Sequence, residues 1–68
     1  MMNKGIVIET WRENRLDVLH LLKEFDCLDI KIMSQDSQTI LASARTSLIG
    51  MFRLFLYLMK HPEMKMYV

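Results

Sequence analysis

The strongest constraint on the fold is the uneven distribution of apolar residues between Thr46 and Lys60. Small or polar side chains recur there at alternating steps of four and three residues, and large apolar side chains fill most of the positions between them. These small or polar positions are Thr46, Gly50, Arg53, Tyr57 and Lys60. Such spacing is typical of an α-helix with one narrow polar stripe and a wide apolar remainder. The hydroxyl side chains of Thr46 and Ser47 directly precede the apolar run, which predicts a helix N-cap.

A strand and a second helix are expected near the amino end. Residues 4–9 contain consecutive β-branched side chains from Ile6 onward, which favours a strand. Thr10-Trp11-Arg12-Glu13 has the T-x-x-E form of a capping box, in which the hydroxyl and the carboxylate each satisfy a free backbone amide. A helix of about four turns is therefore expected to begin at Thr10, with Trp11 on its buried face.

The remaining segments alternate with a period of two. Residues 28–33 alternate apolar and polar side chains after Cys27, residues 34–37 are turn-prone, and residues 39–44 read as a returning strand, so a β-hairpin is expected. Pro62 marks the end of the apolar helix, and residues 64–68 alternate again. The predicted order is β-α-β-β-α-β, an α+β fold with a four-stranded antiparallel sheet and helices on one face.

Length and charge narrow the range of functions. The 68 residues fit a single domain over 1–68, and 51% hydrophobic content argues for a packed globular chain. A net charge of +1 with interleaved signs provides no basic field, so no nucleic-acid partner is expected. The longest apolar run, residues 48–59, is shorter than the ~20 residues that span a bilayer, so we expect no membrane insertion and a cytoplasmic location.

Motifs for metal, cofactor or catalytic chemistry are weak. The single cysteine, Cys27, excludes an internal disulfide and a cysteine-based metal cluster, and it reads as a small buried hydrophobe. Glu13, Asp17, His20 and Glu24 share one helix face, which is typical of a solvated surface rather than a zinc site. We therefore expect no catalytic residue, no metal site and no cofactor.

Residues 47–54, Ser-Leu-Ile-Gly-Met-Phe-Arg-Leu, resemble a motif of HPr, the small phosphocarrier of the bacterial sugar phosphotransferase system. The family motif reads Ser, two apolar residues, Gly, two apolar residues, one variable position and Leu. Leu22-Lys23-Glu24-Phe25 followed by Leu28-Asp29-Ile30 resembles the end of the family's first helix and its second strand. The resemblance implies an HPr-like open-faced sandwich with sheet order 1-4-2-3.

The chain departs from the family at the phosphoacceptor. HPr proteins carry a His in a Gly-x-His-x-Arg-Pro setting at the start of the first helix, and counting back from Phe25 places Trp11 there. Glu13 and Asn14 stand where Arg and Pro are expected. His20 is not expected to replace the acceptor, because it lies in mid-helix between acidic side chains that would repel a phosphoryl group.

The second departure is length, because HPr ends with a third helix that covers half of its sheet. A chain that stops at Val68 would leave that half uncovered. We therefore expect a homo-oligomer, most simply a homodimer.

Three groups of residues are candidates for function. Ser47 matches the position that a regulatory HPr kinase phosphorylates in many family members, and the alternative is that it only caps the helix. Met51, Phe52 and Phe55 correspond to the family's docking surface, and core or dimer packing is an equal alternative. Arg12 and Arg15 are candidates to bind an anion with the first-helix amides, unless they are solvated or paired with acids.

The resemblance and the missing His together lead to one preferred hypothesis. The chain is expected to be a non-catalytic HPr-like protein, related to phosphotransferase-system carriers, that acts by binding a protein partner or through regulation at Ser47. Its partners would be phosphotransferase-system enzymes or an HPr kinase, which connects it with the regulation of sugar transport in bacteria. Two alternatives remain open: a phosphocarrier with a non-standard acceptor, and an unrelated small α+β protein-interaction module.

Overall fold

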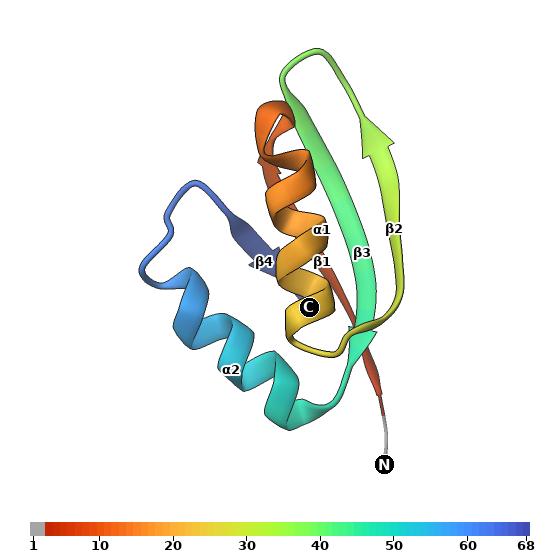
Figure 1. The fold of residues 1–68 in the computed structure, drawn as a ribbon, viewed down its shortest axis with the longest axis vertical. Coiled ribbons are helices and arrows are strands. Elements are labelled where there is room, and N and C mark those ends of the chain that lie inside the picture. Colours follow the sequence, from red (N-terminus) through yellow and green to blue (C-terminus); the bar gives the residue numbers. More distant parts are fainter. Residues whose placement is uncertain (1–2) are drawn as a thin grey trace.

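A computed structural model describes residues 3–68 of the chain (Figure 1). Its elements alternate in the order strand, helix, strand, strand, helix, strand, with a 3₁₀ turn before the first helix. They are β1 (Lys4–Trp11), the 3₁₀ turn η1 (Arg12–Asn14), α1 (Arg15–Glu24), β2 (Leu28–Gln35), β3 (Thr39–Thr46), α2 (Leu48–Leu58) and β4 (Lys65–Tyr67). The predicted α+β class, with two helices and four antiparallel strands, is confirmed.

The strand order is β2-β3-β1-β4, so the predicted order 1-4-2-3 is wrong. β1 and β3 form the centre of the sheet and pair over all eight residues, from Lys4 opposite Thr46 to Trp11 opposite Thr39. On the inner face Ile6 lies opposite Ala44 and Ile8 opposite Ala42, so each large side chain meets a small one. This complementarity favours the pairing of β3 with β1, and the other edge of β3 pairs with β2. The result is a split β-α-β arrangement, in which β3 lies between β1 and β2.

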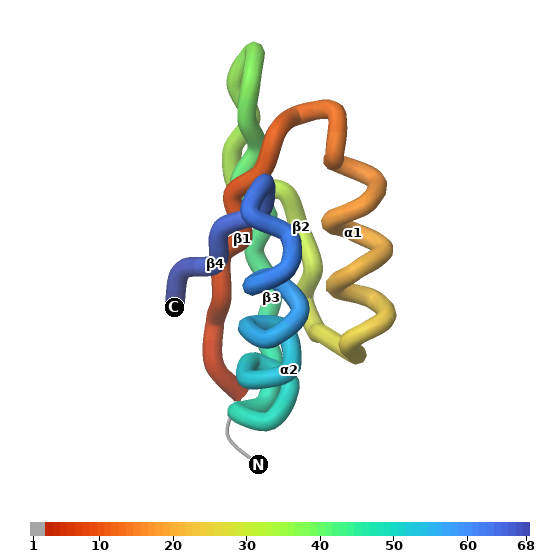
Figure 2. Tube along the Cα trace, turned by 90° about the vertical axis from the view of Figure 1, so that its left-hand side faces the viewer, coloured from red at the N-terminus to blue at the C-terminus, as the bar shows by residue number. Residues whose placement is uncertain are grey.

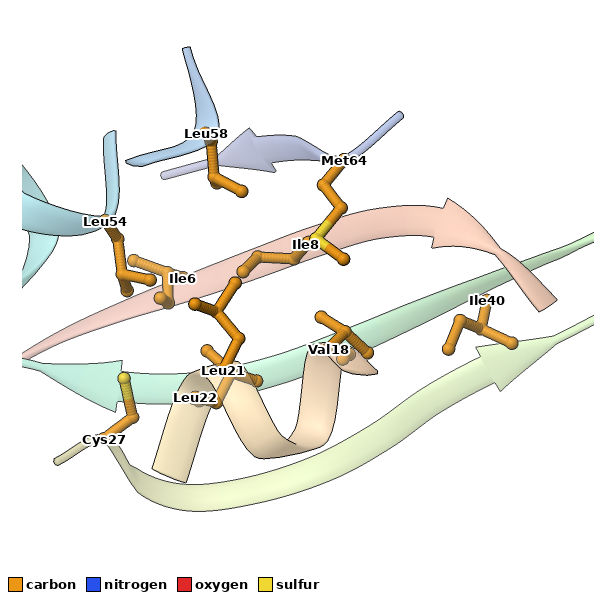
Figure 3. Close-up of a cluster of buried hydrophobic side chains, with 12 residues drawn as sticks. Ile6, Ile8, Val18, Leu21, Leu22, Cys27, Ile40, Leu54, Leu58 and Met64 are labelled. Atoms are coloured by element: carbon orange, nitrogen blue, oxygen red, sulfur yellow. The ribbon is translucent and has the colours of Figure 1, made fainter. Parts of the chain in front are cut away.

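Both helices contribute to one hydrophobic core on one face of the sheet. Figure 2 shows α1 to one side of the strands, and Figure 3 shows side chains of both helices converging on β1. The buried residues are Ile6, Ile8, Val18, Leu21, Leu22, Cys27, Ile40, Ala42, Ala44, Leu54, Leu58 and Met64. The opposite face is mixed: the half-buried Val7 and Leu41 lie on it beside Glu9, whose Oε1 accepts a hydrogen bond from the Tyr67 hydroxyl at 3.2 Å.

The first helix begins later than predicted. β1 continues through Trp11, and α1 starts only at Arg15. The Thr10 hydroxyl does not form a capping box, because it is buried against the segment before β4, where it donates to the Glu63 carbonyl oxygen at 3.1 Å and accepts from Asn14 Nδ2 at 3.1 Å. Trp11 is 50% exposed, so its predicted burial is wrong: the strand conformation turns alternate side chains outward, and Thr10 faces inward.

Local hydrogen bonds fix the ends of α1 and of the hairpin. Asp26, with φ 57°, lies in the left-handed region, and the amides of Asp26 and Cys27 donate to the carbonyls of Lys23 and Leu22 at 3.0 Å each. This is the Schellman arrangement that ends many helices. In the β2–β3 turn, Asp36 Oδ1 accepts from the amides of two residues, Gln38 at 2.8 Å and Thr39 at 2.7 Å. These bonds lower the pKa of Asp36.

Candidate docking surface

The start of α2 is built from the predicted N-cap and one close contact. Ser47 has an extended backbone, and its Oγ accepts from the Gly50 amide at 3.1 Å, which confirms the cap. A side chain on Gly50 would collide with Oγ1 of Thr46, which is itself 4% exposed at the end of β3. The glycine therefore lets the first turn of α2 lie directly against β3.

Contacts with α1 fix the rotation of α2 about its own axis. Leu54 and Leu58 point into the core. On the α1 side, the Tyr57 ring meets the Phe25 ring edge-on at 5.8 Å between centroids, and the Arg53 guanidinium carbon lies 5.6 Å from the centroid of Phe25. The predicted polar stripe thus faces the end of α1, and the remaining surface of α2 points away from both the core and α1.

That remaining surface is strongly apolar. We call it the α2 apolar face, and it consists of Leu48, Ile49, Phe52, Phe55, Leu56 and Met59. Phe52 is 62% exposed and Phe55 is 52% exposed. Exposed apolar residues that are scattered singly need no explanation, whereas a contiguous group of this size marks an interaction site.

A hollow joins this face to the edge of the sheet. It has a volume of about 370 Å³ and lies between α2 and the end of the chain around β4. Figure 1 shows α2 and β4 on the side of the sheet away from β2, and β4 is the edge strand there. The lining residues of the hollow are all apolar: Leu48, Met51, Phe52, Phe55, Met66 and Val68. A hollow without a polar lining group suits an apolar side chain from a partner better than a polar ligand.

The predicted docking residues are brought together, and the sequence left others out. Met51, Phe52 and Phe55 all line the hollow. Met66 and Val68 join them because β4 pairs with β1 beside α2. The predicted strand order also placed β4 next to β1, but the helix pattern alone did not point to these two residues. The width of the apolar surface of the helix could have predicted further exposed residues, because only one side of that surface can pack against the sheet. They are Leu48, Ile49, Leu56 and Met59.

The other candidate residues lie elsewhere. Ser47 is half-buried next to Leu48, at the amino end of the α2 apolar face. Arg45, its near neighbour in sequence, instead pairs with Asp29 at 3.2 Å. Arg12 lies in η1 and Arg15 begins α1, both exposed.

The surface near Arg12 gives little support for anion binding. A hollow of about 520 Å³ there is lined by Trp11, Arg12, Glu13, Ser37 and Gln38. Arg15 does not contribute to this hollow, so the structure does not join the two predicted arginines there. The Glu13 carboxylate beside Arg12 also opposes an anion.

Groups for metal or acid–base chemistry are not clustered in the described part of the chain. Within residues 3–68, no three His, Cys, Asp or Glu side chains come together as a metal-binding group. Burial raises the pKa of the Cys27 thiol, and the neighbouring Thr46 hydroxyl only partly counteracts this. Cys27 is therefore a protonated core side chain at neutral pH rather than a nucleophile. His20 is exposed on α1.

Comparisons with protein-family models, with curated proteins and with solved structures found no match, so they do not assign the chain to the HPr family or to another one. None of the helices in residues 3–68 is both long enough and apolar enough to cross a bilayer.

Proposed function

We propose that the chain is a small, non-catalytic protein-binding module that docks through the α2 apolar face and the adjoining hollow. One observation carries the proposal: five of the eleven residues of α2 are large, apolar and at least 47% exposed, with Met59 extending the same surface. Leaving these side chains in water has no structural benefit for an isolated chain, because the core is already closed by Leu54 and Leu58.

The chemistry of the hollow favours a protein partner over a small polar substrate. Its lining has no titratable side chain, and the close contacts between oppositely charged or ionisable side chains in residues 3–68 lie elsewhere, at Arg45–Asp29 and His61–Glu63. Apolar side chains of a partner would gain about 25 cal/mol for each Å² removed from water.

The relation to phosphotransferase-system carriers has weaker support than protein binding. The HPr order 1-4-2-3 differs from the order β2-β3-β1-β4, and Trp11, at the position of the acceptor His, belongs to a strand rather than to a helix start. A phosphocarrier role through His20 is also disfavoured, because this residue lies within α1, where the backbone amides are engaged. Among the hypotheses from the sequence, we therefore prefer the small α+β protein-interaction module.

Regulation at Ser47 is a second candidate, favoured by its position. The side chain caps α2 directly beside Leu48, so a phosphate would place about two negative charges at the border of the apolar face. The same charge would interact favourably with the amino end of the helix. Phosphorylation would thus weaken apolar docking while keeping α2 folded. Incubation with an HPr kinase followed by mass spectrometry tests this, and a missing Ser47 phosphopeptide removes the hypothesis.

Site-specific photo-crosslinking tests the docking function. A photoreactive phenylalanine analogue at Phe52 should form an adduct with another polypeptide in cells that express the full chain. The matched control carries the analogue at Leu16, which is 66% exposed on α1, compared with 62% for Phe52. Adduct formation at both positions, or at neither, would contradict a docking surface on α2.

A further inference from the structure

We infer that the α2 apolar face binds a second copy of this chain, with the two α2 helices antiparallel about a twofold axis. The inference rests on the proposed function, because it names the occupant of the same surface. Three observations carry it: the area of the surface, the spacing of its side chains and the direction of the Arg53 side chain.

The area is that of one half of a protein–protein interface. Aromatic side chains bury about 150–250 Å² each, and the aliphatic side chains here are somewhat smaller, so the exposed fractions of the α2 apolar face and Val68 correspond to an upper limit on the order of 800 Å². The residues counted are Leu48, Ile49, Phe52, Phe55, Leu56, Met59 and Val68. A standard interface buries about 800 Å² on each partner, and homodimer interfaces are the more apolar kind. A second copy supplies the same area and the same apolar composition.

The spacing of the central stripe is self-complementary. Leu48, Phe52, Phe55 and Met59 follow one another at steps of four, three and four residues, so they form one stripe along α2. This sequence of steps reads the same in both directions. An antiparallel second helix therefore places its Phe55 opposite Phe52 and its Met59 opposite Leu48. Each copy then makes the same contacts, as a twofold interface requires.

One flanking charge, Arg53, is directed away from the stripe, and another, Lys65, lies at the β4 side, where it lines a hollow with Phe55 and Met59. Arg53 lies over the ring of Phe25, at the end of α1, on the side of α2 that faces the rest of the chain. Two antiparallel copies therefore do not bring this guanidinium into the contact between the stripes. On the opposite side of the stripe, the hollow beside Met66 and Val68 can receive an aromatic ring of the second copy.

Sedimentation equilibrium of the full chain tests the association. At high micromolar concentration the wild type should have twice the mass of the 8.1 kDa chain. Phe52→Glu should raise the dissociation constant of the dimer at least roughly 30-fold, the effect expected at an interface hot spot. Leu16→Glu is the matched control, because it places the same charge on an equally exposed position of α1 and should leave the dimer intact. A monomeric wild type, or a Phe52→Glu variant that still dimerises, overturns the inference.

Disulfide trapping tests the antiparallel arrangement separately. The double variant with Leu48→Cys and Met59→Cys should form a covalent dimer under mild oxidation, because each new thiol lies opposite the other one on the second copy. Within one copy the two positions are about 16 Å apart along the helix, too far to link. Each single variant should stay uncrosslinked, as should the wild type, whose Cys27 is buried. Crosslinking of Leu48→Cys alone would indicate parallel helices and overturn the arrangement.

The photo-crosslink at Phe52 separates the two proposals. An adduct with twice the chain mass supports the second copy. An adduct with a different polypeptide, together with a monomeric wild type, overturns the second copy and keeps the docking function. No adduct at Phe52 removes both.

Discussion

Replacing Gly50 by Ala should destabilise the protein, although alanine is normally the better helix residue. The added Cβ would collide with Oγ1 of Thr46 and would lie 3.4 Å from Oγ of Ser47. Thr46 is 4% exposed at the end of β3, so its hydroxyl has little space to rotate away. Either α2 must shift from the sheet or the N-cap bond from Gly50 to Ser47 must lengthen.

The expected size follows from two opposing effects. Overpacking of a closed site costs about 1–3 kcal/mol, and replacing glycine by alanine inside a helix gains about 1 kcal/mol. We expect a net loss of about 1 kcal/mol, and at most about 2 kcal/mol, in the free energy of unfolding. For a domain of this size, each kcal/mol corresponds to about 4–8 °C in the melting temperature.

Urea unfolding at one fixed protein concentration is the appropriate assay, because the proposed dimerisation would make the apparent stability concentration-dependent. Gly5→Ala is the control, because a Cβ there meets no atom within 4 Å, and it should be neutral or slightly stabilising. In a Thr46→Ala background the collision partner is gone, so Gly50→Ala should become stabilising by about 1 kcal/mol. A higher urea midpoint for Gly50→Ala in the wild-type background would refute the reasoning.

Three further predictions concern single positions. Ser47→Ala should cost about 1 kcal/mol through loss of the cap of α2, and Ser47→Asp, which keeps a cap acceptor, should restore the midpoint of thermal unfolding. Asp26→Gly should stabilise the chain by about 1 kcal/mol in the same assay, because φ 57° is unstrained for glycine, and a loss would contradict the Schellman interpretation. Burial raises the pKa of the Cys27 thiol above its ordinary value of 9.0. The protonated thiol therefore contributes fully to stability below pH 9.0, and this contribution is lost as the pH rises through the folded-state pKa. The urea midpoint should therefore fall above pH 9.0, and Cys27→Ala should reduce this decline; an unchanged decline would exclude the thiol as its source.

Local signals predicted most of the elements, because each depends on neighbours in the sequence. The two-residue alternation of side chains predicted the β2–β3 hairpin. The helical spacing of residues 46–60, together with Ser47, predicted α2 and its N-cap. The predicted start of α1 was wrong because the Thr10 hydroxyl does not cap the helix. It instead donates a hydrogen bond to the carbonyl of Glu63, which is distant in the sequence. A capping-box pattern does not contain that information.

The predicted strand order was wrong for a related reason. The pairing of β3 with β1 brings Ile6 opposite Ala44 and Ile8 opposite Ala42, residues that are far apart in the sequence, so no local pattern predicts it. The order taken from the HPr resemblance instead required β4 between β1 and β2. The candidate site was less sensitive to this error, since Met51, Phe52 and Phe55 share a surface of α2 whatever the strand order. Met66 of β4 and Val68, which follows it, join this surface because β4 lies beside β1, and the predicted order also placed these two strands together.

Because β4 is short, it is the strand that should detach from the sheet most easily. Three residue pairs join it to β1, compared with eight between β1 and β3. Segments with so few backbone pairs open at low free-energy cost, long before global unfolding. When β4 detaches, the unpaired amides and carbonyls of β1 become a template for a strand from another chain, and the buried Met64 loses its cover. Hydrogen exchange should therefore be fastest among the strand amides in β4, and exchange of a β4 segment between chains is the route by which this fold would aggregate or swap.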